Sequence, residues 1–441
     1  MKKLLWAVAP LLALAMAVPA APGRQAPPLD VNPVIFVHGG SGSGAQFASQ
    51  AMRFRTNGYP KSHLAVVEYD SGRLQVEEPG DAAIVYAAID ARIAELQAAT
   101  GRAQVDLIGH SRGTTISHGY LADPARAANV AHYVNVDGRP AGAPPGGVPT
   151  LALWAGAVDR PVQGEIVGAV NVTVPNQEHV EVATSAESFV EMFRFFTGRE
   201  PATSEIATEH GLIEIAGRAV IFPDNTGIDG GTLEIWRVNP RSGRRLGRHP
   251  RTTGVLGPDG DFRFVGPQHA HWEFVVKRDG ELPLHYFYER FPRSDHLVRL
   301  NVAPLLEPFF PMGGTDRTGL AVIRYKEYWG DRGVENDVLA IGGVDVINPI
   351  TAPSGAVGAA SVAFFAFDVG VDGVTNLEHV PFPFPLVPFL TGADLFIPVN
   401  DTPLSILTVP RGDEAATRTV NIRRIPSSEG RVVVQLHDFE Q

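Results

Sequence analysis

The segment Val105-Asp106-Leu107-Ile108-Gly109-His110-Ser111-Arg112-Gly113 decides the fold of this 441-residue chain. A strand-like run, residues 105–108, leads directly into Gly-x-Ser-x-Gly, and a helix-compatible stretch, residues 114–121, follows. A sharp turn between strand and helix lifts the serine side chain above the end of a sheet, and the glycines are needed because side chains would clash in so tight a turn. The pentapeptide alone is common, but this context makes it specific. We therefore predict that Ser111 is a nucleophile.

The chain around this segment, from residue 33 to about residue 198, alternates apolar strands with helices. The predicted strands are Val34–Val37, Leu64–Tyr69, Val105–Ile108, Val130–Val136, Leu151–Trp154 and Ala169–Val174. One helix begins near Asp81, and another follows a capping box made of Thr184 and Glu187. Fully apolar strands that alternate with helices imply a parallel sheet covered on both faces. Together with the serine turn, this pattern predicts an α/β-hydrolase fold.

The first predicted strand ends at His38-Gly39-Gly40. In folds of this type the residue after His-Gly offers its backbone N–H to the developing oxyanion, and the residue after the nucleophile offers a second N–H. This reasoning assigns the oxyanion hole to Gly40 and Arg112. A phosphate-binding loop would need a lysine followed by serine or threonine, which this glycine-rich run lacks.

Activation of a serine needs a histidine that takes its proton and a carboxylate that orients the histidine. The chain has 14 histidines. His179 follows the last predicted strand, where a base can reach Ser111. Asp137 and Asp159 both follow strands between Ser111 and His179, in the chain order that this fold uses. Either can orient the imidazole, and strand position by itself favours Asp159.

After Gly198 the sequence changes to short alternating strands separated by turns, which predict antiparallel β domains. The predicted strands are Leu212–Val220, Gly231–Val238, Asp261–Val265, Trp272–Lys277, His285–Tyr288, Leu320–Tyr325, Val338–Val346, Ser361–Asp368, Thr417–Arg424 and Arg431–Leu436. We therefore divide the chain into a signal peptide (1–20), an α/β-hydrolase domain (21–200) and two all-β, sandwich-like domains (204–302 and 303–441).

The N-terminus has the three-part pattern of a secretory signal peptide. Two lysines precede an apolar run, residues 4–18, that ends among small residues. The run is short for a membrane span, and Pro10 interrupts it. We expect cleavage near Ala17 or Ala20 and a secreted protein, extracellular or periplasmic, without a transmembrane segment.

Composition excludes several classes of protein. The formal net charge is −11, and phosphate contacts need clustered Lys and Arg, so we expect no nucleic-acid partner. The chain has no cysteine, which rules out disulfides, an acylated lipoprotein anchor and cysteine-ligated zinc. The acidic residues at 368–373 lack the spacing of a calcium loop, so they predict a turn. We expect no metal and no cofactor.

These motifs resemble the Archaeoglobus-type lipase and carboxylesterase family. The resemblance lies in residues 37–60 and 105–111, in His179 with the Phe-rich stretch after it, and in residues 323–327, and it covers nearly the whole mature chain. It implies an α/β-hydrolase domain followed by β-rich domains that engage lipid, with carboxylic esters as substrates. The family's catalytic acid lies in a Leu-Asp-Gly segment, matched here by Val136-Asp137-Gly138. The resemblance therefore implies Asp137 rather than Asp159.

The chain departs from that family at the lid. The family's lipase has a helical lid between the second strand and the next helix, whereas a short polar loop joins Tyr69 to Asp81 here. We therefore expect an open site without strict long-chain preference. The proline-rich apolar segment 380–390 cannot be a central strand or a helix, and we expect a buried covering loop rather than an exposed patch that contacts lipid.

The sequence thus predicts a secreted serine hydrolase, a lipase or carboxylesterase, that acts on ester or lipid substrates. Its catalytic triad is Ser111, Asp137 and His179, and its mechanism is an acyl-enzyme mechanism without a cofactor. Two alternatives remain. One is a hydrolase of solid polyesters that uses the β domains for surface binding, which film binding by residues 204–441 would test. The other is a non-catalytic lipid-binding module, which failure of a fluorophosphonate to label Ser111 would favour.

Overall fold

A computed structural model of the chain describes residues 29–72, 79–157, 164–304, 314–354 and 361–439. The expected signal peptide, residues 1–20, and the alternative acid Asp159 lie outside these residues. Within the described part of the chain, no helix combines the length and the apolar character needed to cross a membrane.

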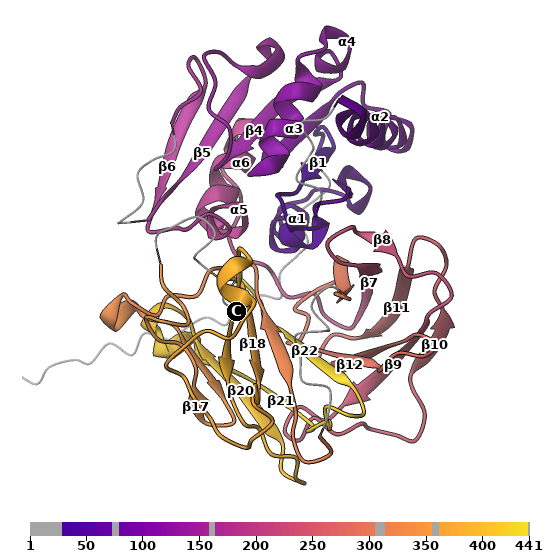
Figure 1. The fold of residues 1–441 in the computed structure, drawn as a ribbon. Helices are drawn as coiled ribbons and strands as arrows, with labels where there is room; N and C mark the ends of the chain where they lie inside the picture. Colours follow the sequence, from indigo (N-terminus) through magenta and orange to yellow (C-terminus); the bar gives the residue numbers. More distant parts are fainter. Residues whose placement is uncertain (1–28, 73–78, 158–163, 305–313, 355–360, 440–441) are drawn as a thin grey trace, which may run out of the picture.

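The N-terminal part contains a six-stranded, fully parallel sheet in the order β2-β1-β3-β4-β5-β6, which confirms the predicted α/β-hydrolase fold (Figure 1). Its strands are β1 (Val34–Val37), β2 (Leu64–Val67), β3 (Val105–His110), β4 (Val130–Val136), β5 (Thr150–Gly156) and β6 (Val170–Pro175). Its helices are α1 (Ala48–Thr56), α2 (Pro79–Thr100), α3 (Arg112–Leu121), α4 (Pro124–Ala127), α5 (Glu181–Thr184) and α6 (Ala186–Thr197).

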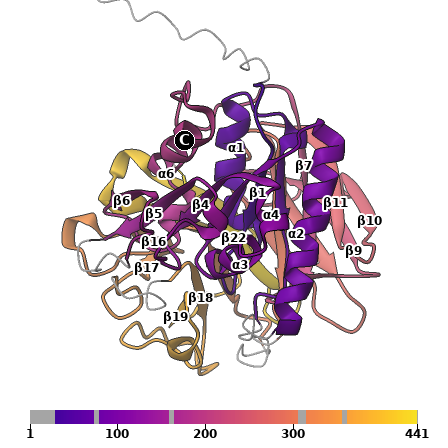
Figure 2. The same cartoon turned by 90° about the horizontal axis from the view of Figure 1, so that it is seen from above.

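The two faces of this sheet bury two separate apolar cores, because alternate residues of each strand point to opposite faces. On one face Phe36 packs against α1 and α6, and Phe189 and Phe193 of α6 are buried there. On the other face Ile35 packs against α2 and α3. Figure 2 looks down on this layer and shows the two pairs of helices on either side of β1 and β4.

The predicted capping box before α6 is wrong by one residue. Ser185 is the N-cap, and its hydroxyl accepts a hydrogen bond from the N–H of Ser188. Thr184 instead ends the short helix α5, and its hydroxyl donates to the carbonyl of Tyr325, far along the chain. A tertiary partner that the local sequence does not show therefore engages the threonine.

The C-terminal part is built on one long sheet of eight strands, in the order β10-β9-β12-β13-β22-β15-β18-β19. Two four-stranded sheets accompany it, one with the path β11-β7-β14 and β8 paired to β7, the other with the order β17-β16-β20-β21. Their strands are β7 (Leu212–Ile221), β8 (Thr226–Gly227), β9 (Thr232–Val238), β10 (Thr252–Val255), β11 (Asp261–Pro267), β12 (His271–Lys277), β13 (Leu284–Tyr288), β14 (Asp295–Val302), β15 (Leu320–Ile323), β16 (Val338–Ile341), β17 (Val344–Asp345), β18 (Ala363–Phe367), β19 (Leu390–Asp394), β20 (Leu404–Val409), β21 (Arg418–Ile422) and β22 (Arg431–Gln435).

The small sheets pack on opposite faces of the long one. In β13, Tyr286 belongs to the core shared with β7 and β14, whereas the next residue, Phe287, belongs to the core shared with β16 and β20. Strands from both sides of residue 303 pair within the long sheet, since β22 lies parallel to β13. The division of the chain into two β domains at residue 303 stays a prediction.

One predicted strand in this region needs correction, and several observed strands were not predicted. Residues 338–346 form a hairpin, β16 and β17, rather than one strand, because the turn at Gly342 and Gly343 has positive φ at both residues. The strands β8, β10, β14, β19 and β20 were not predicted. Of these, β14 pairs with residues 215–221 of β7.

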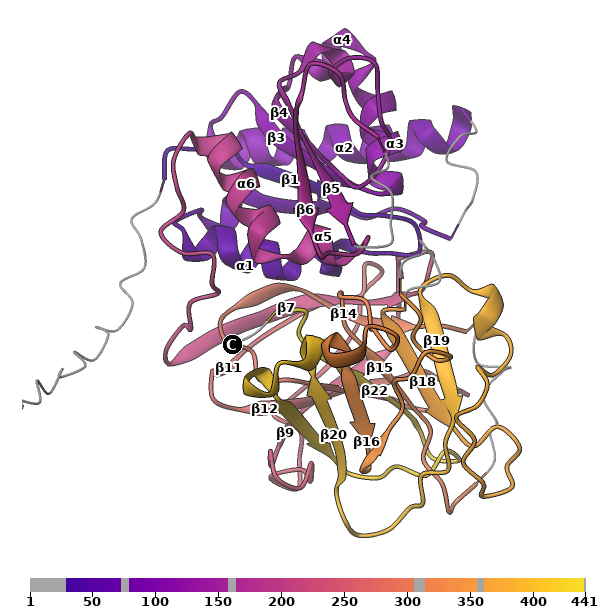
Figure 3. The ribbon, with the colours of Figure 1, turned by 90° about the vertical axis from the view of Figure 1, so that its left-hand side faces the viewer.

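The carboxyl ends of the parallel strands face the β-rich region. Figure 3 shows α1 and α5 at the boundary between the two parts of the molecule. A buried ion pair crosses this boundary between Glu68, just after β2, and Arg299 of β14. Asn225 donates hydrogen bonds to the carbonyls of Gly42 and Tyr69. The edge that carries the predicted site is therefore a packed interface.

Candidate active site

Ser111 lies at the turn between β3 and α3 with φ 53° and ψ −121°, a backbone conformation that non-glycine residues rarely adopt. The turn holds because the following residues pack directly against the neighbouring strand. A methyl group at Gly113 would overlap the carbonyl oxygen of Val37 in β1, so the second glycine of the motif is required sterically. The strained serine is thus presented at the carboxyl edge of the sheet.

The structure brings His179 and Asp137 together. His179 Nδ1 lies 2.5 Å from Asp137 Oδ2, and the other carboxylate oxygen, Oδ1, accepts the backbone N–H of Ala155 at 3.0 Å. The side chain of Asp137 is fully buried and that of His179 is 8% exposed. A buried carboxylate with two donors keeps a fixed orientation, so it can hold the imidazole ring.

His110, the residue before Ser111, connects the serine turn to His179. Its Nδ1 lies 2.6 Å from Gln46 Nε2, and its Nε2 lies 2.8 Å from the carbonyl oxygen of His179. A carbonyl can only accept, so Nε2 carries the proton and Nδ1 accepts from the glutamine. The rings of His110 and His179 are 4.7 Å apart. His110 therefore connects the serine turn to residues 176–180, the histidine loop.

The loop predicted to form the oxyanion hole lies against the serine. A Cβ at Gly39 would be 3.1 Å from the Cβ of Ser111, and one at Gly40 would be 3.2 Å from Cζ of Arg112. Arg112 begins α3, where backbone N–H groups have no partner within the helix. Its guanidinium donates to the carbonyl of Ser71 at 3.0 Å. The structure therefore places Gly40 and Arg112 next to each other.

Buried polar groups support this loop from behind. The ring of His38 stacks on Tyr69 at 4.1 Å, and the Tyr69 hydroxyl donates to the His38 carbonyl at 2.6 Å. Burial lowers the pKa of His38, which keeps the ring neutral near pH 7. Burial alone would raise the pKa of Glu68, but the charges of Arg299 and His38 and the hydrogen bonds from Arg299 and Gly44 together lower it.

The expectation of an open site is wrong at His179. The ring of Phe389 stacks on the imidazole at a centroid distance of 6.0 Å and an angle of 15°. Phe389 has φ 66°, and its carbonyl accepts the N–H groups of Val362 and Ala363, which hold it in this conformation. The β-rich region thus covers the site from a position 210 residues further along the chain, which no local pattern reveals.

The proline-rich segment 380–390 is neither fully buried nor fully exposed. Phe384 is buried against Phe365 and Phe367, which agrees with a covering loop. Phe382 and Leu386 are 67% and 74% exposed, however, because they lie on the outer side of the loop. The segment therefore covers the sheet and also presents two apolar side chains to solvent.

A cavity of about 190 Å³ lies between the glycine-rich loop and the long sheet. It begins at residues 41–43 and at Phe389, and it extends over the face of β15, β18 and β22 that neither small sheet covers. Apolar side chains line most of it, including Phe222, Ile323, Phe365, Phe367 and Leu390. Within the described residues, no group of three or more His, Asp or Glu side chains could hold a metal ion.

Three family models match the chain and together span most of it. A model of class 2 lipases matches residues 31–122, a model of lipase C-terminal domains matches residues 211–304, and a further C-terminal domain model matches residues 312–440. The first match includes the His-Gly-Gly loop and Ser111 and ends before Asp137. No curated protein matches the chain.

Solved structures that are similar to this chain have low sequence identity to it. A carboxylesterase from Bacillus subtilis is 12% identical with a TM-score of 0.29, and the match covers 40% of this chain and 87% of the carboxylesterase chain. A lipase-esterase related protein from Clostridium acetobutylicum is 13% identical with a TM-score of 0.29, and the match covers 37% of this chain and 94% of the other. A carboxylesterase from Bacillus cereus is 13% identical with a TM-score of 0.26, covering 37% and 89%.

The fold and the lipase match define a carboxylic ester hydrolase with an α/β-hydrolase fold. The matches to a class 2 lipase domain, to a lipase C-terminal domain and to a further C-terminal domain confirm the resemblance of its motifs to the lipase and carboxylesterase family.

Proposed function

We propose that this enzyme cleaves carboxylic esters through an acyl-enzyme formed on Ser111, with His179 as general base and Asp137 as the acid that orients it. The observation that carries the proposal is the buried 2.5 Å contact between His179 Nδ1 and Asp137 Oδ2, on a loop that is hydrogen-bonded to the residue before Ser111. The Asp137 carboxylate accepts a hydrogen bond from Nδ1 of His179, so Nδ1 carries the ring proton. Nε2 is therefore unprotonated and can accept the proton of Ser111.

The reaction proceeds in two halves. Ser111 Oγ attacks the ester carbonyl carbon while its proton passes to Nε2 of His179, and the tetrahedral oxyanion is stabilised by the N–H groups of Gly40 and Arg112. The intermediate collapses, and the departing alkoxide takes the proton from Nε2 as the alcohol. Water then attacks the acyl-enzyme by the same proton path and releases the carboxylic acid and the free serine.

The apolar cavity next to Phe389 favours substrates with an extended acyl chain. Its near end lies at residues 41–43, next to Gly40 in the chain, and at Phe389, which stacks on His179. We infer that a chain attached to Ser111 through its carbonyl extends into it. Each buried CH₂ group contributes about 0.8 kcal/mol of apolar transfer energy, and binding should strengthen with chain length until the cavity is filled. We propose a lipase-type substrate, a long-chain acyl ester, for a secreted enzyme.

The test is hydrolysis of p-nitrophenyl esters from acetyl to palmitoyl by the wild type and by Ser111→Ala, Asp137→Ala and Asp159→Ala. Loss of activity in the first two variants with retention in the third is the expected result, with the highest kcat/KM on a medium or long chain. Equal activity of Ser111→Ala and wild type would refute the mechanism. A wild type that is inert on every ester and is not labelled by a fluorophosphonate would favour the lipid-binding alternative.

The exposed apolar side chains Phe382 and Leu386 favour a second candidate function, the hydrolysis of solid polyesters, because they lie on the same segment as Phe389. A film-binding assay compares the wild type with Phe382→Ser/Leu386→Ser. Loss of binding and of film hydrolysis in the double variant, with unchanged activity on a dissolved ester, would favour a solid substrate. For secretion, N-terminal sequencing of the exported protein should give a chain that starts after Ala17 or Ala20.

A further inference from the structure

The peptide group that follows His179 is held from both sides. Its carbonyl oxygen accepts from His110 Nε2 at 2.8 Å, and its N–H, that of Val180, donates to Oε1 of Glu327 at 2.5 Å. The second oxygen of Glu327 accepts the N–H of Glu181 at 2.9 Å. A peptide group is planar, so two hydrogen bonds at its opposite ends fix the backbone orientation of the histidine itself.

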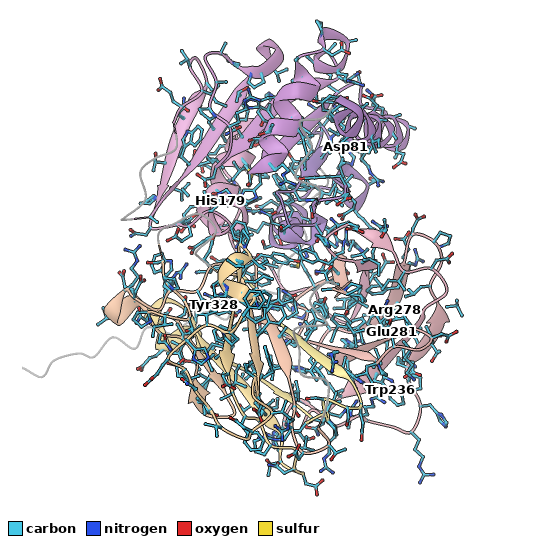
Figure 4. The ribbon with its side chains drawn as sticks, viewed as in Figure 1. Asp81, His179, Trp236, Arg278, Glu281 and Tyr328 are labelled. Carbon is cyan, nitrogen blue, oxygen red and sulfur yellow. The ribbon has the colours of Figure 1, made fainter. Side chains whose placement is uncertain are left out.

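Glu327 comes from the β-rich region, four residues after the end of β15, and its side chain is fully buried. Figure 4 shows His179 at the boundary between the two parts of the molecule, with Tyr328, the neighbour of Glu327 in sequence, on the β-rich side. The histidine loop therefore receives one of its hydrogen bonds from the α/β part and the other from the β-rich region.

Neighbouring contacts hold the segment that carries Glu327 against the segment that follows His179. Glu181 forms ion pairs with Arg411 at 2.7 Å and with Lys326 at 3.1 Å, both from the β-rich region. The hydroxyl of Thr184 donates to the carbonyl of Tyr325 at 3.0 Å. The contacts before and after Glu327 join the same two segments, so the position of its carboxylate relative to His179 is well defined.

We propose that Glu327 is a positioning residue of the hydrolytic reaction: by binding the N–H groups of Val180 and Glu181 it orients His179 toward Ser111, so that the β-rich region completes the catalytic site. The inference rests on the proposed roles of Ser111 and His179. It extends them, because it gives the β-rich region a part in the chemical step in addition to covering the site.

Burial of a carboxylate at this position costs desolvation free energy, and this cost favours a functional role for Glu327. Burial raises the pKa of Glu327 to about 7, and the hydrogen bond from Val180 opposes the rise. A neutral acceptor could bind the same N–H groups at lower desolvation cost. When ionised, Glu327 also adds a negative charge close to His179, which favours the imidazolium formed as Ser111 attacks.

The experiment compares full-length wild type, Glu327→Gln and Glu273→Gln on one soluble p-nitrophenyl ester. Glutamine keeps one acceptor oxygen but turns an N–H₂ group toward the other N–H. We expect kcat of Glu327→Gln to fall roughly 10- to 100-fold with KM within about twofold, because the base is misplaced while the binding surface is intact. The apparent pKa of the acid limb of kcat/KM should also fall, since a charge that stabilised the imidazolium is gone.

Glu273 is the matched control. It is a fully buried glutamate of the same β-rich region, paired with Arg245, Arg423 and His285. Glu273→Gln should lower thermal stability and leave kcat and the acid limb unchanged. An equal fall of kcat in both variants, or wild-type kcat and an unmoved acid limb in folded Glu327→Gln, overturns the proposal. Activity in Ser111→Ala would instead overturn the proposed function.

A measurement on the wild type covers the case in which Glu327→Gln does not fold. Amide hydrogen exchange at Val180 and Glu181 should be as slow as in the central strands of the hydrolase sheet, because both N–H groups are bound and buried. Fast exchange at these two amides, in a chain whose sheet amides stay protected, would overturn the proposal.

Discussion

Asp137→Asn is the sharpest test of the proposed triad, because the structure dictates how the asparagine must lie. One side-chain oxygen has to accept the N–H of Ala155, which lies 3.0 Å from Oδ1 of the native carboxylate. This bond turns the new N–H₂ group toward Nδ1 of His179. Nδ1 then has to accept, the ring proton moves to Nε2, and Nε2 can no longer take the proton of Ser111.

The expected loss follows from that tautomer. A wrong tautomer in a serine hydrolase triad lowers kcat by about 10⁴, or about 5 kcal/mol of transition-state stabilisation at 1.36 kcal/mol for each factor of ten. KM should change little, because Asp137 is buried and cannot touch the acyl chain. The assay is steady-state hydrolysis of p-nitrophenyl butyrate, with urea unfolding to show that the variant is folded.

Asp106→Asn is the control for the loss of a buried aspartate that binds a histidine. Asp106 of β3 is almost fully buried and lies 2.8 Å from Nδ1 of His132, the same arrangement as in the candidate site but outside it. The variant Asp106→Asn should destabilise the fold and leave kcat within a fewfold of the wild-type value. If Asp137→Asn stayed within tenfold of wild type while Ser111→Ala was inactive, the acid would be elsewhere, with Asp159 the first candidate.

Two further predictions concern the cover of the site and the buried carboxylate behind it. Phe389→Ala removes the ring that stacks on His179 and borders the cavity. Because about 1–2 kcal/mol of apolar contact is lost, kcat/KM for palmitoyl esters should fall roughly tenfold. The kcat/KM for acetyl esters should change little. An equal loss on both esters would assign the ring to holding His179 instead. The pKa of Glu327 is raised to about 7 by burial and by the charges of Glu181 and Glu178, with His179 opposing, so the folded state holds the proton more tightly than the unfolded state. Stability from this group is present below about pH 4.5 and is lost as the pH rises through 7, on the order of 3 kcal/mol. Urea unfolding from pH 5 to 8 should therefore show a steeper decline for wild type than for Glu327→Gln, and parallel curves would contradict the assignment.

The local features of the α/β part could be predicted from the sequence because their causes are local. The strand β4 was predicted with its observed bounds, and the helix predicted to begin near Asp81 is α2. The serine turn was predictable for the same reason, since a strand, two glycines and a helix within a dozen residues allow one geometry. Where a long-range partner intervenes, as Tyr325 does at Thr184, the local rule failed.

Chain order limited the predicted site to Ser111, His179 and two aspartates, but it could not choose between the aspartates without the family resemblance. Carboxyl ends of parallel strands meet at one edge, and both aspartates follow such strands. What brings Asp137 to His179 is the parallel alignment of β4, β5 and β6 side by side in one sheet, together with a hydrogen bond from Ala155 of β5 to Asp137. The two contacts join residues that are separated by 18 and by 42 positions in the sequence.

The sequence by itself determined the elements whose energetics are settled within a few residues: the apolar strands, the amphipathic helices, the serine turn and the glycine-rich loop. Only the tertiary structure decided what covers the site and what holds its histidine. Phe389 and Glu327 come from the β-rich region, more than 140 residues after His179, and reach it because β13, β22 and β15 share one sheet that packs under the hydrolase edge. Pairing between distant strands depends on the burial of whole faces, which no local stretch of sequence specifies.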